Sequence, residues 1–508
     1  VYVKMLPSGE PVQLTHDDRP KMSPGFSPDG SRIAYTVPGP IWDTWAVPVL
    51  GGEPRLWLPN ASGLGWIDKS KLLFSEIKDQ VLHMALVTAD ESRAESRDLY
   101  VPPHERGMVH RSYPSPDGKR MLLVEMNERG VLVRCRLAPL DGSSAGQQVG
   151  PPTGACTFAA WSPDGKWMYF SSDSGGAFHI WRQRFPDGQP EQITSGPTEE
   201  EGLAMASDGR SFITAVGLTQ SSIWLHNGGG DRQISLEGYA FAPKFTPDGK
   251  RLLYQVRKGA SSELWVAELD SGRSEPLLPG FAVALAGTGG AGYDISPDGR
   301  QVVVASPDSG GKLRLWLAPL DRRSPPRQIP NIEGEQPVFG ATGEVFFRRV
   351  EGTSAFLYRV QQDGGGLRKA IDQPFVGLMG ESADRNWLVL GLGLHASDGM
   401  VIFRVDGGAP LLTQLPPPIE IGWSGDGKHL FVQGRFANNV GKAYVLPLAP
   451  GHMVPESIVH GLPSEQEILK LPGARVIPSS NVEPGPTADT YAFTRESVQR
   501  NLYRVPAP

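Results

Sequence analysis

A short turn sequence, Ser-Pro-Asp-Gly or a close variant, recurs along the chain. Each copy follows a short apolar run and precedes a run rich in Val, Ile, Leu and Tyr. Pro and Asp suit a tight turn and Gly supplies positive φ, so each copy predicts a β-hairpin. The turn aspartates are Asp29, Asp117, Asp164, Asp208, Asp248, Asp298 and Asp426, with more divergent copies around Asp68, Thr342, Asp384 and Asp489. Nine of the ten steps between these anchors measure 39 to 50 residues, which is the length of a four-stranded propeller blade. The remaining step measures 63 residues.

A second hairpin pattern follows each turn by about ten residues, so one period holds four strands. Helical patterning is nearly absent, apart from Ser464 to Leu471 with its Ser-x-x-Glu-like start. The fold class is therefore all-β, a β-propeller of about eleven four-stranded blades. Eleven blades exceed a common single ring, so we expect two tandem propellers.

The predicted division gives residues 1–235 to the first propeller, with blades 1–5, and residues 236–508 to the second, with blades 6–11. The N-terminal hairpin, residues 1–15, is expected to take part in ring closure. An insertion is expected near residues 456–485.

Composition narrows the function classes. The chain has 508 residues with 49 basic and 55 acidic side chains, a balance that disfavours nucleic-acid binding. No stretch of about 18 apolar residues occurs, so no membrane span is expected. Because the chain starts at Val1 without a signal peptide, we expect it to be a processed or excised part of a longer protein. Cys135 and Cys156 either form a disulfide or remain buried thiols.

Short sequences that match nucleotide-binding, nucleophile or metal-binding motifs lack the surrounding secondary structure that those motifs need. Gly287–Gly292 matches G-x-G-x-x-G and Gly142–Gly146 matches G-x-S-x-G, but strand and turn patterns surround both. His104 and His110 are six residues apart, and one helical face cannot present both to a metal. We therefore expect no catalytic residues, no metal and no cofactor, and any kinase or hydrolase activity would lie outside this chain.

The repeats resemble the TolB-like, WD40-like (PD40-type) propeller repeat, and the resemblance covers essentially the whole chain. The sequence is also similar to the C-terminal propeller region of bacterial transmembrane serine/threonine kinases, in runs such as WDTWAVPVLGGEPRL and NLYRVPAP. In such proteins a kinase and a membrane span precede the repeats. This resemblance implies a bacterial protein with an extracytoplasmic location, either periplasmic or at the cell surface.

The leading functional hypothesis is a non-enzymatic recognition or sensor module that binds a protein or peptide through propeller loops. The alternatives are a self-assembling structural subunit and an accessory domain of a hydrolase whose catalytic domain is absent here. Loops that precede the Ser-Pro-Asp-Gly strands carry mixed charge and aromatic residues, a composition that protein-binding sites favour. The predicted partner-binding residues are His16, Asp17, Arg19, Lys21, His104, Arg106, His110, Glu200, Glu201, Tyr239, Phe241, Tyr293 and Asp294.

Overall fold

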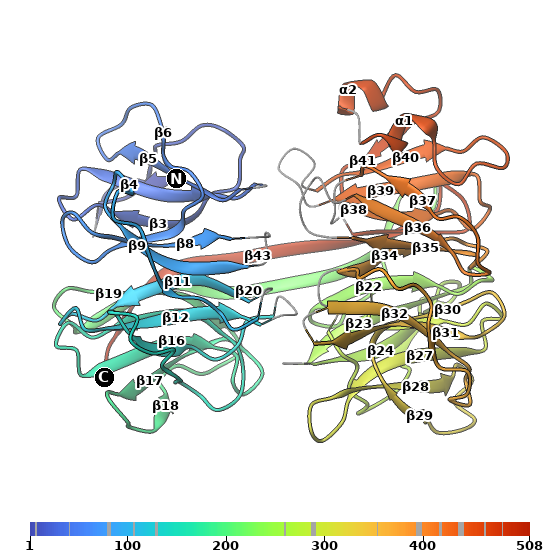
Figure 1. The fold of residues 1–508 in the computed structure, drawn as a ribbon, viewed down its shortest axis with the longest axis horizontal. Coiled ribbons are helices and arrows are strands. Elements are labelled where there is room, and N and C mark those ends of the chain that lie inside the picture. Colours follow the sequence, from blue (N-terminus) through green and yellow to red (C-terminus); the bar gives the residue numbers. More distant parts are fainter. Residues whose placement is uncertain are drawn as a thin grey trace. The chain divides into compact units, whose positions relative to one another are not determined.

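The protein is almost entirely built from antiparallel β-sheets and divides into two compact units (Figure 1). Unit 1 comprises Val1–Leu218 and Gln499–Pro508, and unit 2 comprises Thr219–Val498. Among the described residues, no helix is long and apolar enough to cross a membrane. The computed structural model describes residues 1–5, 8–39, 41–78, 83–104, 107–127, 131–258, 261–285, 291–352, 354–392, 399–415, 419–434, 441–461, 464–479 and 481–508.

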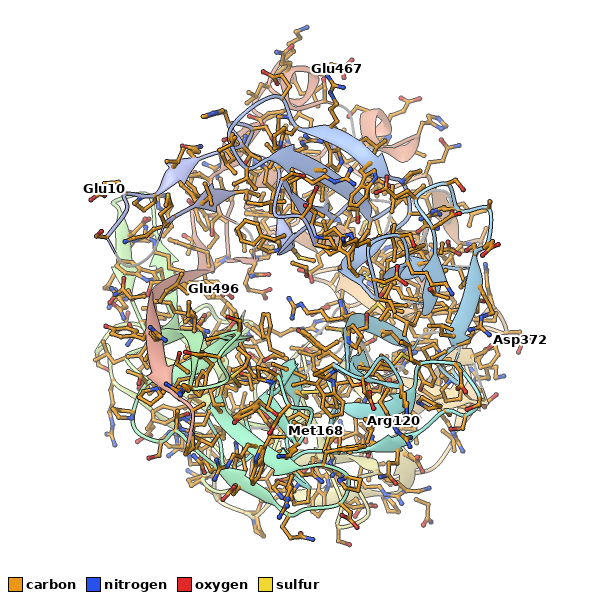
Figure 2. The ribbon with its side chains drawn as sticks, turned by 90° about the vertical axis from the view of Figure 1, so that its left-hand side faces the viewer. Glu10, Arg120, Met168, Asp372, Glu467 and Glu496 are labelled. Atoms are coloured by element: carbon orange, nitrogen blue, oxygen red, sulfur yellow. A yellow bond between two sulfur atoms is a disulfide. The ribbon has the colours of Figure 1, made fainter. Side chains whose placement is uncertain are left out.

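Unit 1 contains four successive groups of four strands, arranged around a common centre (Figure 2). Each group runs in sequence order from its first strand to its fourth. One parallel pair, Met84 with Met108, joins the second and third groups into one sheet. The strands are β1 Tyr2–Val3, β2 Val12–Gln13, β3 Met22–Phe26, β4 Arg32–Val37, β5 Asp43–Pro48, β6 Arg55–Leu58, β7 Ser62–Trp66, β8 Leu72–Ile77, β9 Met84–Ala89, β10 Arg97–Tyr100, β11 Met108–Pro114, β12 Arg120–Met126, β13 Arg136–Pro139, β14 Gln147–Gln148, β15 Cys156–Trp161, β16 Trp167–Ser172, β17 His179–Arg184, β18 Pro190–Gln192 and β19 Glu199–Met205.

Unit 2 contains five sheets of four strands in sequence order and one sheet assembled from distant parts of the chain. Two long strands, β20 Ser211–His226 and β43 Tyr491–Pro506, contribute to both units. The other elements are β21 Asp231–Gln233, β22 Ala240–Phe245, β23 Arg251–Lys258, β24 Ser261–Glu268, β25 Ser274–Pro276, β26 Tyr293–Ile295, β27 Gln301–Pro307, β28 Leu313–Pro319, β29 Arg327–Glu333, β30 Glu335–Phe339, β31 Val345–Glu351, β32 Ser354–Val360, β33 Arg368–Lys369, β34 Gly377–Glu381, β35 Trp387–Gly391, β36 Met400–Arg404, β37 Leu411–Thr413, β38 Ile419–Trp423, β39 His429–Gly434, β40 Ala443–Pro447, α1 Glu456–Val459, α2 Glu465–Ile468, β41 Arg475–Ile477 and β42 Val482–Pro484.

The fold class predicted from the repeats is confirmed: the chain is an all-β propeller protein. The division of the chain differs from the predicted boundary between residues 235 and 236. Because β20 continues without a break from residue 211 to residue 226, the exchange between units falls within that strand, after Leu218. The last ten residues return to unit 1.

The turn aspartates all lie between the first and second strands of their sheets, and they hold the turn together. A hydroxyl two residues before the aspartate donates to its Oδ1 at 2.6 Å in six copies, for example Ser162 to Asp164 and Thr246 to Asp248. The same Oδ1 accepts from the backbone N–H two residues later, at 3.1 Å from Lys166. One carboxylate thus satisfies two donors, so the repeated aspartates serve the fold.

Buried apolar clusters lie between successive sheets and close unit 2 into a ring. The sheet β22–β25 packs on β26–β29, then β30–β33, β34–β37 and β38–β41 follow, each pair with its own cluster. The ring closes through the sixth sheet, whose order is β42, β43, β20, β21. Ile223 and Ala492 of this sheet pack on β22–β25, and Phe493 packs on β38–β41.

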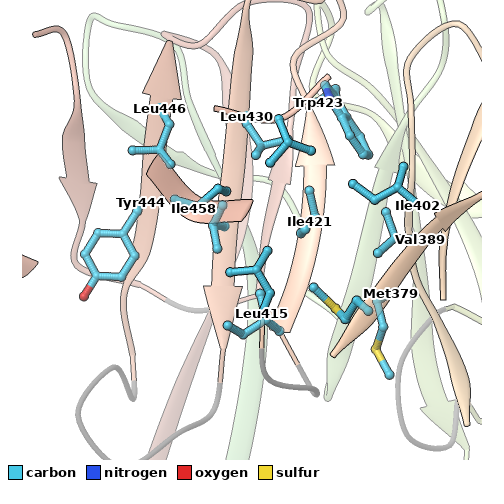
Figure 3. Packing of buried hydrophobic residues seen from close by; sticks show 14 of the residues in the cluster. Met379, Val389, Ile402, Leu415, Ile421, Trp423, Leu430, Tyr444, Leu446 and Ile458 are labelled. Carbon is cyan, nitrogen blue, oxygen red and sulfur yellow. The ribbon is translucent and has the colours of Figure 1, made fainter. Parts of the chain in front are cut away.

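The largest cluster in unit 2 shows how neighbouring sheets interlock (Figure 3). Val389 and Ile402 from one sheet face Ile421 and Leu430 from the next. Ile458 of α1 and Ile468 of α2 are fully buried in the same cluster. Both helices lie between β40 and β41, within the region predicted as an insertion, and α2 begins with a capping box formed by Ser464 and Glu467.

Cys135 and Cys156 form a disulfide within unit 1. Both are buried, in the apolar cluster between β11–β14 and β15–β18. Cys135 directly precedes β13 and Cys156 begins β15, so the bond joins two neighbouring sheets and limits the freedom of the unfolded chain.

The turn glycines provide a test of the repeat. Gly165 and Gly299 have φ of +70° and +66°. We expect Gly165→Val and Gly299→Val each to lower the free energy of unfolding by about 1–2 kcal/mol, because a β-branched residue is strained at positive φ. Urea denaturation gives the value. Lys166→Val, at an exposed neighbour with ordinary backbone geometry, is the control. Equal stability of all three variants would contradict the role of the glycines.

Candidate functional site

Unit 2 encloses a cavity of about 470 Å³ at the centre of its ring. All six sheets contribute to the wall, chiefly through the first strand of each sheet. One lining residue from each first strand is Phe241 of β22, Tyr293 of β26, Gln336 of β30, Leu378 of β34, Glu420 of β38 and Glu483 of β42. The volume lies within the range of ligand pockets in proteins.

Aromatic side chains stand at the start of β22. The rings of Tyr239 and Phe241 lie 6.2 Å apart, and the Tyr239 hydroxyl donates to the exposed Glu496 carboxylate at 2.9 Å. Tyr293 is buried instead, and its hydroxyl donates to the carbonyls of Ala242 at 2.8 Å and Leu253 at 2.9 Å. Tyr239 and Phe241 therefore offer partly exposed aromatic surface, whereas Tyr293 fixes the wall.

A buried ion-pair network crosses from sheet to sheet beside the cavity. Asp294 of β26 is fully buried, and each of its carboxylate oxygens meets one cation. Oδ1 lies 3.1 Å from Lys244 Nζ of β22, and Oδ2 lies 2.6 Å from Arg385 Nη1 in the turn after β34. Oδ2 also accepts from the backbone N–H of Phe339 at 2.8 Å. Lys244 pairs in addition with Glu381, so this network joins three sheets.

Electrostatics explains why these groups stay charged. Burial by itself would raise the pKa of Asp294, but Arg385 and Lys244 outweigh burial and hold that pKa below its usual value. Burial likewise opposes the charge on Lys244, yet Asp294 and Glu381 raise the pKa of its ammonium group. The network is thus internally neutralised and fully engaged in holding the sheets.

Glu483 differs from its neighbours in the same cavity. Loss of solvation raises the pKa of Glu483 to about 8, although Lys244 and Arg385 act to lower it. The charges of Glu381 and Asp294 raise it further. No hydrogen bond or ion pair joins its carboxyl group to another described residue. At neutral pH the group is therefore mostly protonated, and it faces the cavity without a partner.

The predicted residues of unit 1 are placed differently from those of unit 2. Asp17 pairs locally with Arg19 at 3.0 Å and Lys21 at 2.8 Å, and His16 is exposed beside them. His104 is partly buried. Arg106 lies outside the described residues, as does most of the Gly287–Gly292 segment. A binding role for His16, Asp17, Arg19, Lys21, His104 and Arg106 stays a prediction.

Three other predicted residues of unit 1 make contacts with residues of the same unit. His110 contacts the Trp42 ring at 5.7 Å between centroids, and burial lowers its pKa to about 4. Glu200 is buried in β19, where its carboxylate meets His179 Nδ1 at 2.8 Å and the Thr194 hydroxyl at 2.7 Å. Glu201 pairs with Arg500 at 2.5 Å. Glu200 and Glu201 were predicted to bind a partner, but both lie in strand β19 and Glu200 is buried there.

Sequence reasoning missed Lys244, Glu381, Arg385 and Glu483. A signal for part of the network was present. Lys244 and Asp294 both stand four residues before a turn aspartate, and at this position the other five Asp-Gly copies carry small or apolar residues or Tyr. Two opposite charges at one repeat position of adjacent blades predict an ion pair. Glu381, Arg385 and Glu483 stand at other repeat positions and give no such signal.

The chain shows only remote similarity to known proteins. No family model matches the chain. An uncharacterized protein, Atu1656, of Agrobacterium fabrum is 23% identical over 244 residues, covering 45% of this chain and 79% of that protein. TolB from Acinetobacter baumannii is 19% identical with a TM-score of 0.30, covering 62% of this chain and 65% of TolB, slightly under two thirds of its length. An oligogalacturonate lyase in complex with manganese is 15% identical with a TM-score of 0.31, covering 62% and 95%.

The solved structures thus include TolB, the propeller type that the repeats resemble. Likeness at these identities concerns the fold alone, and the similarity to kinase propeller regions stays a prediction. Among the described residues, no group of three or more His, Cys, Asp or Glu is arranged to hold a metal ion.

The Asp294 network predicts a large effect on stability. Asp294→Asn removes the charge that neutralises Lys244 and Arg385 in a buried position, so we expect the free energy of unfolding of unit 2 to fall by about 3–5 kcal/mol. Urea denaturation measures it. Asp270→Asn, at an exposed turn, is the matched control. A loss no larger than that of the control would show that the network does not support the ring.

Glu483 predicts a pH dependence of stability. Its pKa rises from 4.5 in the unfolded chain to about 8 in the folded one, so the folded state binds the proton more tightly. The stabilisation is complete below about pH 4.5 and is lost as the pH rises to about 8, by an amount on the order of a few kcal/mol. In Glu483→Gln this loss should be absent. The test compares the fall in the free energy of unfolding between pH 5 and pH 8 in the variant with the fall in wild type. Glu268→Gln, on the exposed end of β24, should leave it unchanged.

Proposed function

We propose that this chain is a recognition module rather than an enzyme, and that unit 2 binds a protein or peptide partner at its central cavity. The cavity itself carries the proposal, because it combines apolar and aromatic walls with a few polar groups, as binding pockets do. Tyr239 and Phe241 supply the aromatic anchors that dominate many interfaces. They belong to the loop and strand start that the sequence predicts as a binding surface.

The chemistry of the wall supports binding over catalysis. Lys244 and Glu381 of the wall pair with each other, so neither is free to act as a base or an acid on a substrate. Asp294, Lys244, Arg385 and Glu381 neutralise one another and hold three sheets together. A rigid wall of this kind lowers the entropy cost of binding.

A location outside the cytoplasm is part of the proposal. The disulfide between Cys135 and Cys156 supports it, since such bonds persist in oxidising compartments. The resemblance of the repeats to TolB-type proteins agrees. In that setting a sensor role would consist of a response to partner binding.

The test selects peptides from a displayed library on the immobilised full chain and measures their affinity by titration. Tyr239→Ala should weaken a selected peptide by about thirtyfold, the loss typical of an aromatic hot spot. Lys250→Ala is the control, since Lys250 is exposed in the same sheet beside the Asp-Gly turn.

Two results would contradict the proposal. Equal losses from Tyr239→Ala and Lys250→Ala would remove the cavity from the binding surface. Failure to select any peptide, together with concentration-dependent assembly in sedimentation velocity, would favour the self-assembling subunit instead. A hydrolase domain in the parent gene would favour the accessory-domain alternative.

A further inference from the structure

The cavity of unit 2 carries an excess of negative charge. Four carboxyl groups line it, those of Glu381, Glu420, Glu483 and Glu496, against the one lining cation Lys244. Lys244 is already engaged by Asp294 and Glu381. In a low-dielectric space, unneutralised carboxylates are costly, so each must keep its proton or meet a positive charge.

The four carboxyl groups are not equivalent. Glu381 pairs with Lys244, Glu420 accepts from Gln433 at 3.3 Å, and Glu496 accepts from Tyr239. Glu483 is left as the one lining carboxyl group for which the described residues provide no donor. The charged groups that act on it come from other elements: Lys244 on β22, Asp294 on β26, and Glu381 and Arg385 at the end of β34.

A second, independent observation comes from the neighbouring strand. Thr494 of β43 lines the same cavity and is only 8% exposed, yet its hydroxyl has no hydrogen-bond partner among the described residues. β42 pairs with β43, with Glu483 opposite Ala492 and Val482 opposite Phe493. Buried hydroxyl groups are normally satisfied, so an unpaired one on a cavity wall is open to a bound ligand or a water molecule.

We infer that the cavity receives a cationic side chain of the partner peptide, arginine or lysine, with Glu483 as its counter-ion and the Thr494 hydroxyl as a further acceptor. This inference rests on the proposed function and names the chemistry that the site selects. The stem of such a side chain is apolar and can pack along the aromatic surface of Tyr239 and Phe241 while its head meets the carboxylate.

Cation binding at Glu483 is coupled to proton release. Because the pKa of Glu483 in the empty site is about 8, the carboxyl group must lose its proton to pair with the ligand. Affinity should therefore rise with pH, by up to about tenfold per unit between pH 6 and 8, and become constant above that. A neutral ligand of the same shape should show no such trend.

The experiment uses the full chain and a blocked tripeptide, acetyl-Gly-Arg-Gly-amide, with its citrulline analogue as the neutral isostere. Saturation-transfer NMR gives both dissociation constants in the millimolar range from pH 6 to 9. We expect the arginine peptide to bind at least tenfold more tightly than the citrulline peptide at pH 8.5. Glu483→Gln should abolish this preference and the pH dependence, and Thr494→Val should weaken arginine binding several-fold. Glu268→Gln is the control and should change neither.

Each outcome separates the inference from the proposed function. Equal binding of the two tripeptides, or a preference that survives in Glu483→Gln, overturns the cation site, whereas loss of selected peptides in Tyr239→Ala would still uphold peptide recognition. n-Butylguanidinium, which carries the same single charge without a peptide, serves as the second probe. If it binds as tightly as the arginine tripeptide and with the same dependence on Glu483, the cation site stands and the peptide assignment fails. Should Glu483→Gln not fold, the pH series on wild type and Thr494→Val decide the question, and a flat series overturns it.

Discussion

Closure of the ring in unit 2 is the constraint on which the rest of that unit depends. Each propeller sheet buries both faces against its neighbours, so the first and last sheets must also meet or leave apolar faces in water. The closing sheet contains β20 and β21 from the middle of the chain and β42 and β43 from its end. Within this sheet the Arg495 guanidinium lies 4.0 Å from the centre of the Trp224 ring, and Trp224 packs in the same cluster as Phe493. The cavity exists only when this sheet is in place, because it supplies Glu483, Thr494 and Glu496 to the wall.

The two ends of each first strand have different tasks. One end leads into the Asp-Gly turn, where the hydroxyl-to-aspartate bond leaves little freedom in sequence. The other end, together with much of the strand, faces the cavity and varies from sheet to sheet. Bulges mark this end: Ala242 and Gln336 have φ of +49° and +50°, a conformation that costs about 1 kcal/mol or more in non-glycine residues. Tyr293 stabilises the first bulge by donating to the Ala242 carbonyl. Repetition at one end thus fixes the scaffold, while the other end is free to acquire specific chemistry.

Much of the fold could be predicted because the turn signal is local. Every anchor from Asp29 to Asp489 lies between a first and a second strand, and the helical start at Ser464 forms as a capping box. The exchange between units after Leu218 could not be predicted, since a continuous strand of suitable composition carries no mark of where its partners change. Three predicted binding residues, Tyr239, Phe241 and Tyr293, line the cavity, and their role in binding stays a prediction. Asp294, also predicted, is a buried partner of Lys244 and Arg385. Glu381, Arg385 and Glu483 depend on which sheets meet across the ring, and this is long-range information that no single repeat contains.

Asp294 and Glu483 show how one cavity separates structural charge from charge that is open to a ligand. Both are acidic, both lie on first strands, and both experience Lys244 and Arg385. Asp294 receives two cations and a backbone donor, so its desolvation is offset within the protein and its pKa falls. Glu483 receives no donor from the described residues, so its loss of solvation outweighs the nearby cations and its pKa rises to about 8. A bound cation would replace the proton of this carboxyl group at the same position. The ion-pair network therefore does more than hold three sheets together: because it engages Lys244 and Arg385, Glu483 is left without a donor among the described residues of the wall.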